Sequence, residues 1–261
     1  MSGAPPRQHA VNLAVAALGV LVLAWRLVDL DLAPFINDEP QFLAAARDQL
    51  ATGRVLTRST IVGTSGYYYG GAIFWFYGAL QWLGVTTAQG CLRAMTATVT
   101  VAQLAFGLAV ARHVLGAPSL RAVLRHERGW LPGVLWLLIG ASPHQFFWSR
   151  LAWDQLTNAV AFAVVAASLG PASARRAAGV GILLGFGLSS HPMLAPFALF
   201  AGLFVVIGEG SFAWKAALSR AVALGGAATL VLLPWLRELW LQRQREPTFT
   251  LAAPLTLERA A

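Results

Sequence analysis

Apolar residues are gathered into eight runs, and each run is separated from the next by a shorter stretch that is polar or charged. The runs cover residues 11–30, 71–85, 92–111, 130–147, 155–169, 177–190, 193–207 and 221–235. A helix that crosses a lipid bilayer needs about 20 apolar residues, with a lower limit near 17. The longer runs meet this requirement, so the pattern predicts an all-α fold: a polytopic membrane helix bundle.

Charged residues between the runs predict how the helices are oriented. The basic residues of the N-terminal segment and of three loops are Arg7, Arg112, Arg121, Arg125, Arg128, Arg175, Arg176, Lys215 and Arg220. Short loops rich in Lys and Arg stay in the cytoplasm, so all of these residues and the N-terminus are expected there. An even number of membrane crossings must therefore separate one basic stretch from the next. The three runs between Arg7 and Arg112 break this rule.

The run 71–85 is the weakest of those three, because it is short, contains Gln81 and has four aromatic residues in succession at 74–77. We interpret it as an interfacial helix that lies on the outer membrane surface. The chain then has about seven transmembrane helices. Residues 31–93 form a long first outer loop that carries interfacial helices. Residues 1–236 form the transmembrane module, and 237–261 form a polar outer tail, interpreted as the start of a further C-terminal part.

Composition supports a membrane environment. Hydrophobic residues make up 57% of the chain and charged residues only 11%, with a mean hydropathy of +0.62. A soluble domain carries about 25% charged residues. The net charge of +8 does not indicate a nucleic-acid partner, since the basic residues lie between apolar runs and not on one face. The single cysteine, Cys91, excludes an intrachain disulfide and a cysteine-based zinc site.

Two acidic residues, Asp38 and Glu39, follow the first run. Adjacent carboxylates near a membrane repel each other and are costly to desolvate. One interpretation is a helix start, in which Asn37 or Asp38 caps, Pro40 occupies the first turn and a helix covers 41–51. The other interpretation adds a general base or a metal ligand at the same place. Both interpretations can hold together.

A second polar stretch, with Arg150 and Asp154, precedes the run 155–169. In a helix these two residues would form an (i, i+4) ion pair, although Arg, Trp and Asp together also suit an interfacial anchor. The topology places Asp154 on the same outer side as Asp38 and Glu39, so the three carboxylates could converge.

Three further residues at the outer side are candidates for ligand contact. His191 stands between Ser190 and Pro192, where it is either a structural turn residue or a contact for a lipid phosphate. Tyr68 and Tyr69, followed by two glycines, suit either a sugar-stacking surface or an interfacial aromatic belt, and the belt is the preferred interpretation.

In order and spacing, these elements resemble the GT-C glycosyltransferases, most closely the branch of the protein O-mannosyltransferases and aminoarabinose transferases. The resemblance covers about residues 10 to 235. Its matching features are Asp38-Glu39 after the first run, the stretch ending Thr52-Gly53, the aromatic segment ending Leu83-Gly84, Arg93 at the start of the second span, and Ser149-Arg150 with Asp154. The chain departs from the family in having Phe42 where a tyrosine is frequent. It also has Tyr68-Tyr69-Gly70-Gly71 in place of a Lys-Pro-Pro-Leu-like element, and family members are usually much longer.

The resemblance implies a membrane enzyme that transfers a sugar from a polyprenyl-phosphate carrier to an acceptor hydroxyl on the non-cytoplasmic face of the cell membrane. By resemblance, Asp38 is the catalytic base with Glu39 as its alternate, and Asp154 is a second acid. The expected substrate contacts are Arg150, His191, Arg93, Tyr68 and Tyr69. A divalent metal, where one is used, would be held by Asp38, Glu39 and Asp154.

Two other functions fit a chain of this kind, namely a multi-pass transporter or lipid flippase, and an inactive membrane fragment. A transporter requires ionisable groups near the middle of the membrane and helices that are broken there. The strongest acids lie instead at the outer boundary, which favours the enzyme.

Overall fold

The structure is a computed structural model that describes residues 5–28, 39–56, 58–62, 67–148, 155–191, 194–208 and 213–245. Within these residues the helices are α1 (Pro6–Ala24), η1 (Trp25–Leu27), α2 (Glu39–Thr52), α3 (Ala72–Trp82), α4 (Ala88–Leu115), α5 (Leu120–Arg125), α6 (Leu131–Ala141), α7 (Pro143–Trp148), α8 (Gln155–Ser168), α9 (Ala174–Ser190), α10 (Ala195–Ile207) and α11 (Trp214–Arg245). Two short antiparallel strands, β1 (Arg58–Val62) and β2 (Tyr67–Gly70), pair with each other.

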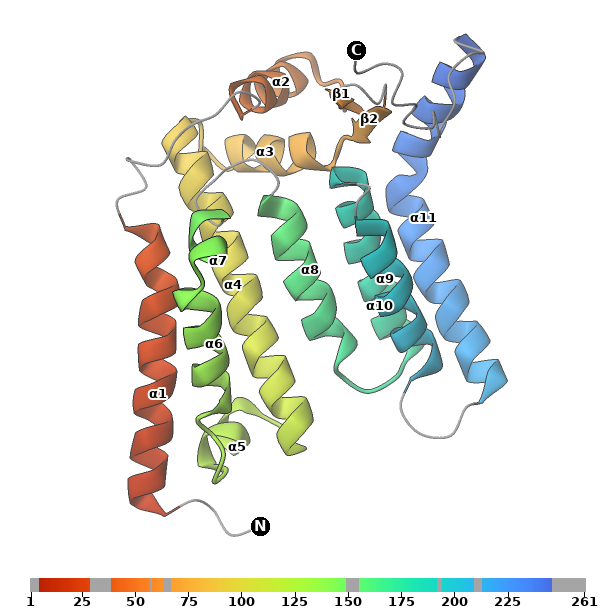
Figure 1. Cartoon of the computed structure of the whole chain (residues 1–261). Coiled ribbons are helices and arrows are strands. Elements are labelled where there is room, and N and C mark those ends of the chain that lie inside the picture. The colour runs from red at the N-terminus through yellow and green to blue at the C-terminus, as the bar shows by residue number, and fades with distance from the viewer. Residues whose placement is uncertain are drawn as a thin grey trace, which may run out of the picture.

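The helices form an upright bundle with a crosswise layer at one end (Figure 1). Helices α1, α4, α6, α8, α9, α10 and α11 stand side by side, and α2, α3 and the β1–β2 hairpin lie across their upper ends. The N-terminus, α5 and the first turns of α9 and α11 lie at the lower end. The predicted helical bundle is therefore confirmed, and so is a helix over 41–51. The hairpin was not predicted.

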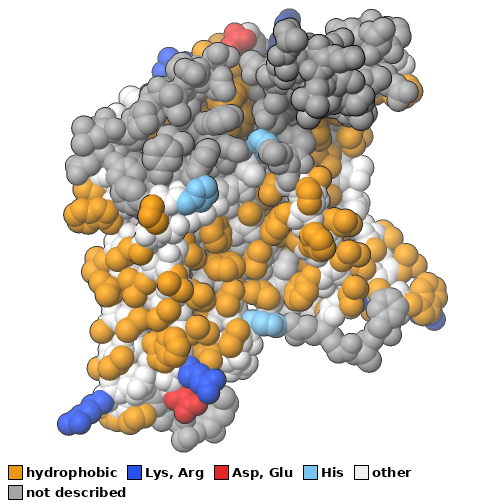
Figure 2. Space-filling model, viewed as in Figure 1, with side chains coloured by type: hydrophobic (Ala, Val, Ile, Leu, Met, Phe, Trp, Pro, Cys, Tyr) orange, Lys and Arg blue, Asp and Glu red, His pale blue; other side chains and the backbone are white. Residues whose placement is uncertain are grey.

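Three of the bundle helices are long and apolar enough to cross a membrane, by length and composition. They cover Pro6–Leu27, Ala88–Leu115 and Trp214–Leu241. The apolar helices α6, α8 and α10 are shorter. Large apolar side chains such as Leu21, Phe200 and Leu230 are exposed on the outside of the bundle. They form a broad apolar belt, with charged side chains gathered toward its two ends (Figure 2). A belt of this kind matches lipid better than water.

Polar residues at the helix ends explain where several helices begin and stop. The Thr87 side chain accepts a hydrogen bond from the Gly90 amide and caps the start of α4. Gly116, with φ of 59°, ends the same helix in the left-handed conformation that favours glycine. At the lower end the buried Asn12 of α1 donates to the carbonyl oxygens of Leu124 and His126, at 3.1 and 2.9 Å, and so fixes the end of α5 against α1.

The boundaries of several predicted segments change in the structure. The run 130–147 is divided into α6 and α7 at Ser142, which has extended backbone angles. The cause is Pro143, because a proline disfavours the helical conformation of the residue before it. The last helix continues through Pro234, beyond the predicted end at 235, so 237–245 of the predicted polar tail is helical. The basic loop 112–128 contains the short helix α5.

Helices α9 and α11 pack closely because glycines line the surface between them. A Cβ atom added to Gly181 would lie 2.2 Å from the carbonyl oxygen of Leu224, and one added to Gly185 would lie 2.8 Å from that of Ala228. Small residues let two helix backbones approach, which is the main source of helix association in lipid. The α9–α11 contact therefore depends on these two positions.

Candidate functional site

The structure does not describe the side chains of most of the predicted site residues. Asp38, Arg150 and Asp154 lie outside the described residues. The backbone of Glu39 opens α2, and Tyr68 and Tyr69 lie in β2, but their side chains are not described. The carboxylate set proposed for a divalent metal is therefore untested. The side chains of Arg93 and His191 are described.

The two helices that directly follow the predicted acids meet in one apolar cluster. Phe42 and Leu43 belong to the start of α2, and Leu156 belongs to the start of α8. All three are buried in the same core, at 4%, 6% and 3% exposure, together with residues of α3 and α4. Residues from the starts of α2 and α8 thus belong to one apolar cluster, which α3 and α4 complete at the upper end of the bundle.

Hydrogen bonds hold α2 firmly on α3 and on the start of α4. Gln81 is buried and donates to the Leu43 carbonyl at 3.2 Å, and Arg47 donates to the Thr86 carbonyl at 2.8 Å. The rings of Phe42 and Phe74 pack edge to face with 5.7 Å between centroids. The run 71–85, predicted as an interfacial helix, contains the crosswise α3, and the Gln81 amide joins α3 to α2.

His191 lies beside the start of α8 and is half-buried. It is the C-terminal cap of α9, and its backbone N–H donates to the Gly187 carbonyl at 2.8 Å. The neighbouring Ser190 hydroxyl is 3.4 Å from the Thr157 hydroxyl, which joins the end of α9 to the first turn of α8. The helix-end position predicted for His191 is confirmed, and the structure places it next to the helix that follows Asp154.

Strand β2 also reaches the end of α9. A Cβ atom added to Gly70 would lie 2.0 Å from the Ser189 hydroxyl oxygen, so only a glycine fits between the strand and the helix. The backbone that carries Tyr68 and Tyr69 therefore lies close to the end of α9. Arg93 lies in the second turn of α4, with its side chain exposed.

Within the described part of the chain, two buried polar atoms without a hydrogen-bond partner lie in the same region. The Gln155 side chain is buried at the start of α8, and its Oε1 atom has no hydrogen-bond partner among the described residues. The same is true of the Ser189 hydroxyl. Buried polar atoms are normally paired, so these two unpaired atoms are unusual features of the upper end of the bundle.

A buried polar network inside the bundle was missed by the sequence analysis. Arg26 is fully buried; its Nη1 donates to Gln103 at 2.7 Å, and its Nη2 donates to the Ile139 carbonyl. The Gln103 amide donates to Gln145 at 3.1 Å, and Asn158 donates to the same oxygen at 3.1 Å. The available signal was an ionisable residue inside the run 11–30 and a glutamine in the middle of the run 92–111.

The upper end of the bundle thus combines a rigid apolar base, hydroxyl and amide groups, and an imidazole. Such a set can bind a polyol next to a lipid chain, and it can contact a phosphate through His191. Comparisons of the chain with protein-family models, with curated proteins and with solved structures find no match. Function is therefore inferred from the residues themselves.

Proposed function

We propose that the protein is a membrane glycosyltransferase that moves a sugar from a polyprenyl-phosphate carrier to an acceptor hydroxyl on the non-cytoplasmic face of the membrane. One observation carries this proposal: α2 and α8, which follow Asp38-Glu39 and Asp154, begin around one buried cluster. This packing supports a site in which the carboxylates share one small space. Gln155 and Thr157 in the first turn of α8, and His191 at the end of α9, lie at the same end of the bundle.

The chemistry needs one base and one set of positive groups. As the acceptor oxygen forms its bond to the anomeric carbon, the bond from that carbon to the phosphate oxygen breaks, and polyprenyl phosphate leaves. Asp38 takes the proton of the acceptor hydroxyl, with Glu39 as its alternate. Asp154 orients the acceptor, and Arg150, His191 and Arg93 stabilise the charge that develops on the departing phosphate.

A divalent metal is compatible with this site, because carboxylate oxygens are suitable ligands for hard cations. In that case Asp38, Glu39 and Asp154 would hold it. A bound divalent cation would add positive charge beside the phosphate. The assignment of Asp38 as the general base does not depend on a metal and is tested separately.

The functional test is transfer from a radiolabelled polyprenyl-phosphate hexose in membranes that contain this chain. Formation of a labelled acceptor product, absent from membranes without the chain, is the expected result. Photo-crosslinking of a polyprenyl-phosphate sugar to the protein provides a readout that does not depend on knowing the acceptor. A protein that neither crosslinks the carrier nor forms product would remove the glycosyltransferase proposal.

The proposal places the crosswise layer outside the cell membrane and the basic lower end in the cytoplasm, with seven upright spans. Thr60 lies in β1 at the upper end, and Leu120 lies in α5 at the lower end. In a Cys91→Ala background, Thr60→Cys is expected to react with an impermeant thiol reagent from outside intact cells. Leu120→Cys is expected to react only after the cells are opened. Reaction of both cysteines from the same side would contradict the seven-span topology.

The shared cluster also predicts that Asp38 and Asp154 approach within about 10 Å, as two acids of one small site do. The double variant Asp38→Cys, Asp154→Cys, again without Cys91, is expected to be joined by a short bifunctional thiol reagent. Pairing Asp154→Cys with Leu120→Cys provides the control, because Leu120 lies at the opposite end. If the first pair joined no better than the control pair, Asp154 would not belong to the site.

The buried network around Arg26 favours a second candidate, a transporter or lipid flippase. A fully buried arginine that is bonded to Gln103 inside the bundle is an ionisable group in a candidate membrane span. Movement of a fluorescent polyprenyl-phosphate lipid across proteoliposomes would identify this function. Such movement without sugar transfer would favour the flippase over the enzyme.

A further inference from the structure

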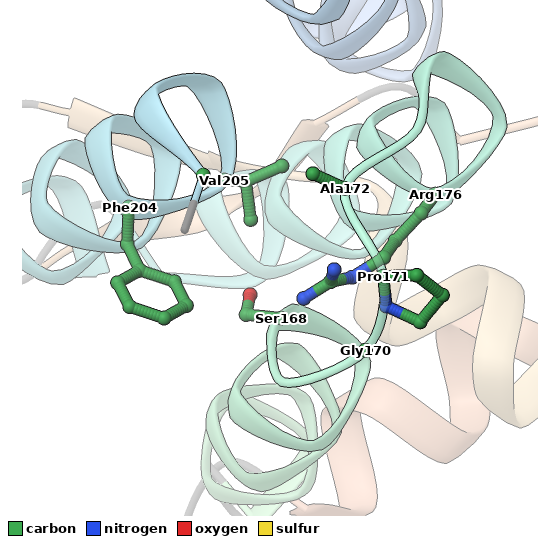
Figure 3. A pocket seen from close by; sticks show the side chains of 8 residues that line it. Ser168, Gly170, Pro171, Ala172, Arg176, Phe204 and Val205 are labelled. Atoms are coloured by element: carbon green, nitrogen blue, oxygen red, sulfur yellow. The ribbon is translucent and has the colours of Figure 1, made fainter. Parts of the chain in front are cut away.

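A pocket of about 220 Å³ opens at the lower end of the bundle, opposite the candidate active site (Figure 3). Its walls come from the end of α8, the loop that follows, the first turn of α9 and the end of α10. The lining includes Ser168, Pro171, Ala172, Arg176, Val205 and Gly208. The described lining residues include no acidic side chain.

Two arginines give this pocket a positive potential. The Nε atom of Arg176 donates to the Ala167 carbonyl, and this bond fixes the guanidinium at the pocket wall. Arg220 donates to the Val206 and Ile207 carbonyls, both at 2.9 Å, and its Nη2 lies next to Gly208 of the lining. Each arginine thus caps a helix C-terminus, which carries only about half an elementary negative charge.

The Ser168 hydroxyl is a second and independent sign of a ligand. Its side chain is 4% exposed, and its Oγ atom has no hydrogen-bond partner among the described residues. Figure 3 shows this oxygen beside the Arg176 guanidinium, on the wall of the pocket. A hydroxyl and a guanidinium together are typical partners of phosphate oxygens.

We propose that this pocket binds the phosphate of an anionic phospholipid headgroup. The pocket lies at the basic end of the bundle, where Arg175 and Lys215 are also found. Basic pockets between membrane helices on the cytoplasmic side attract anionic lipid headgroups. Phe204 and Val205 provide an apolar wall beside the charged groups, which suits the glycerol and first acyl carbons of a lipid. The site is separate from the proposed transfer chemistry.

Equilibrium binding of a fluorescent phosphatidylglycerol to the purified full chain in detergent tests the proposal. Arg176→Gln removes the charge, and Ala172→Leu fills the exposed mouth of the pocket without changing any charge. Arg176→Gln is expected to weaken binding about tenfold, the loss typical of one charge-assisted hydrogen bond. Ala172→Leu is expected to weaken binding by a similar factor, because its larger side chain occupies the space of the headgroup. Arg121→Gln is the matched control, because Arg121 is an exposed arginine of α5 at the same end of the bundle. The affinity of this variant for the lipid should change less than twofold.

Three outcomes would overturn the proposal. An equal loss in Arg121→Gln would show general attraction to a basic surface. Equal affinity for phosphatidylcholine would show that the anionic headgroup is not recognised. Competition by inorganic phosphate that displaces the lipid completely at equal concentration would identify a free-phosphate site instead. Should Arg176→Gln fail to fold, because it removes a helix cap, Ala172→Leu decides alone.

Discussion

Asp38→Asn is expected to lower the rate of sugar transfer by a factor of about 10² to 10⁴, the usual contribution of a general base. Asparagine has nearly the same shape as aspartate and caps a helix equally well. The start of α2 and its packing through Phe42 and Leu43 should therefore stay unchanged. The measurement is transfer from the labelled polyprenyl-phosphate sugar in membranes, at equal protein levels and equal thermal midpoint.

Asp48→Asn provides the matched control. Asp48 lies on α2, and its side chain is exposed. Its substitution removes one negative charge from the same layer and should leave transfer within about twofold, as expected for an exposed position outside the site. Wild-type activity in Asp38→Asn would exclude the base assignment and leave Asp38 only the helix-cap role. Equal losses in both variants would indicate a general effect of charge on substrate binding.

Much of the bundle could be predicted because lipid imposes a simple requirement on sequence. Each run interpreted as a span contains an upright helix, and three of these helices are long and apolar enough to cross a membrane by length and composition. The run 71–85 contains the crosswise α3. The basic stretches also lie together at one end. Such features depend on local composition, which can be seen directly in the order of apolar and charged residues along the chain. The break at Ser142 could also have been predicted, since the proline that causes it stands in the sequence.

Features that depend on tertiary contact could not be predicted. Gln103 lies in an apolar run, and nothing local indicates that Arg26 and Gln145 will reach it from other helices. Strand β2 fits closely against Ser189 of α9 because residue 70 is a glycine, which is a tertiary contact that no local pattern indicates. For the candidate site, the sequence indicated only that the acids share one side. The apolar cluster that contains Phe42 and Leu43 of α2 and Leu156 of α8 is a result of tertiary packing.

Two glycines of α9 lie in different surroundings. Substituting each of them distinguishes the effect of packing on stability from the effect of helix propensity. Gly181 faces the backbone of α11, whereas a Cβ atom at Gly179 would meet nothing within 4 Å. Both lie inside the same helix, two residues apart. Leucine is a better helix former than glycine by up to about 1 kcal/mol, so propensity alone favours both substitutions. Only the contact with α11 distinguishes them.

Gly181→Leu is therefore expected to destabilise the protein by roughly 3 kcal/mol or more, because overpacking against backbone atoms cannot be relieved by a side-chain rotation. For a chain of this size the loss corresponds to a fall of about 5–10 °C in the thermal midpoint. Gly179→Leu should leave the midpoint unchanged or raise it. The measurement is the midpoint of monodispersity after heating in detergent. Because Ser190 and His191 end the same helix, Gly181→Leu should also lower sugar transfer, while Gly179→Leu should not. Equal midpoints for the two variants would mean that α9 and α11 do not pack through Gly181.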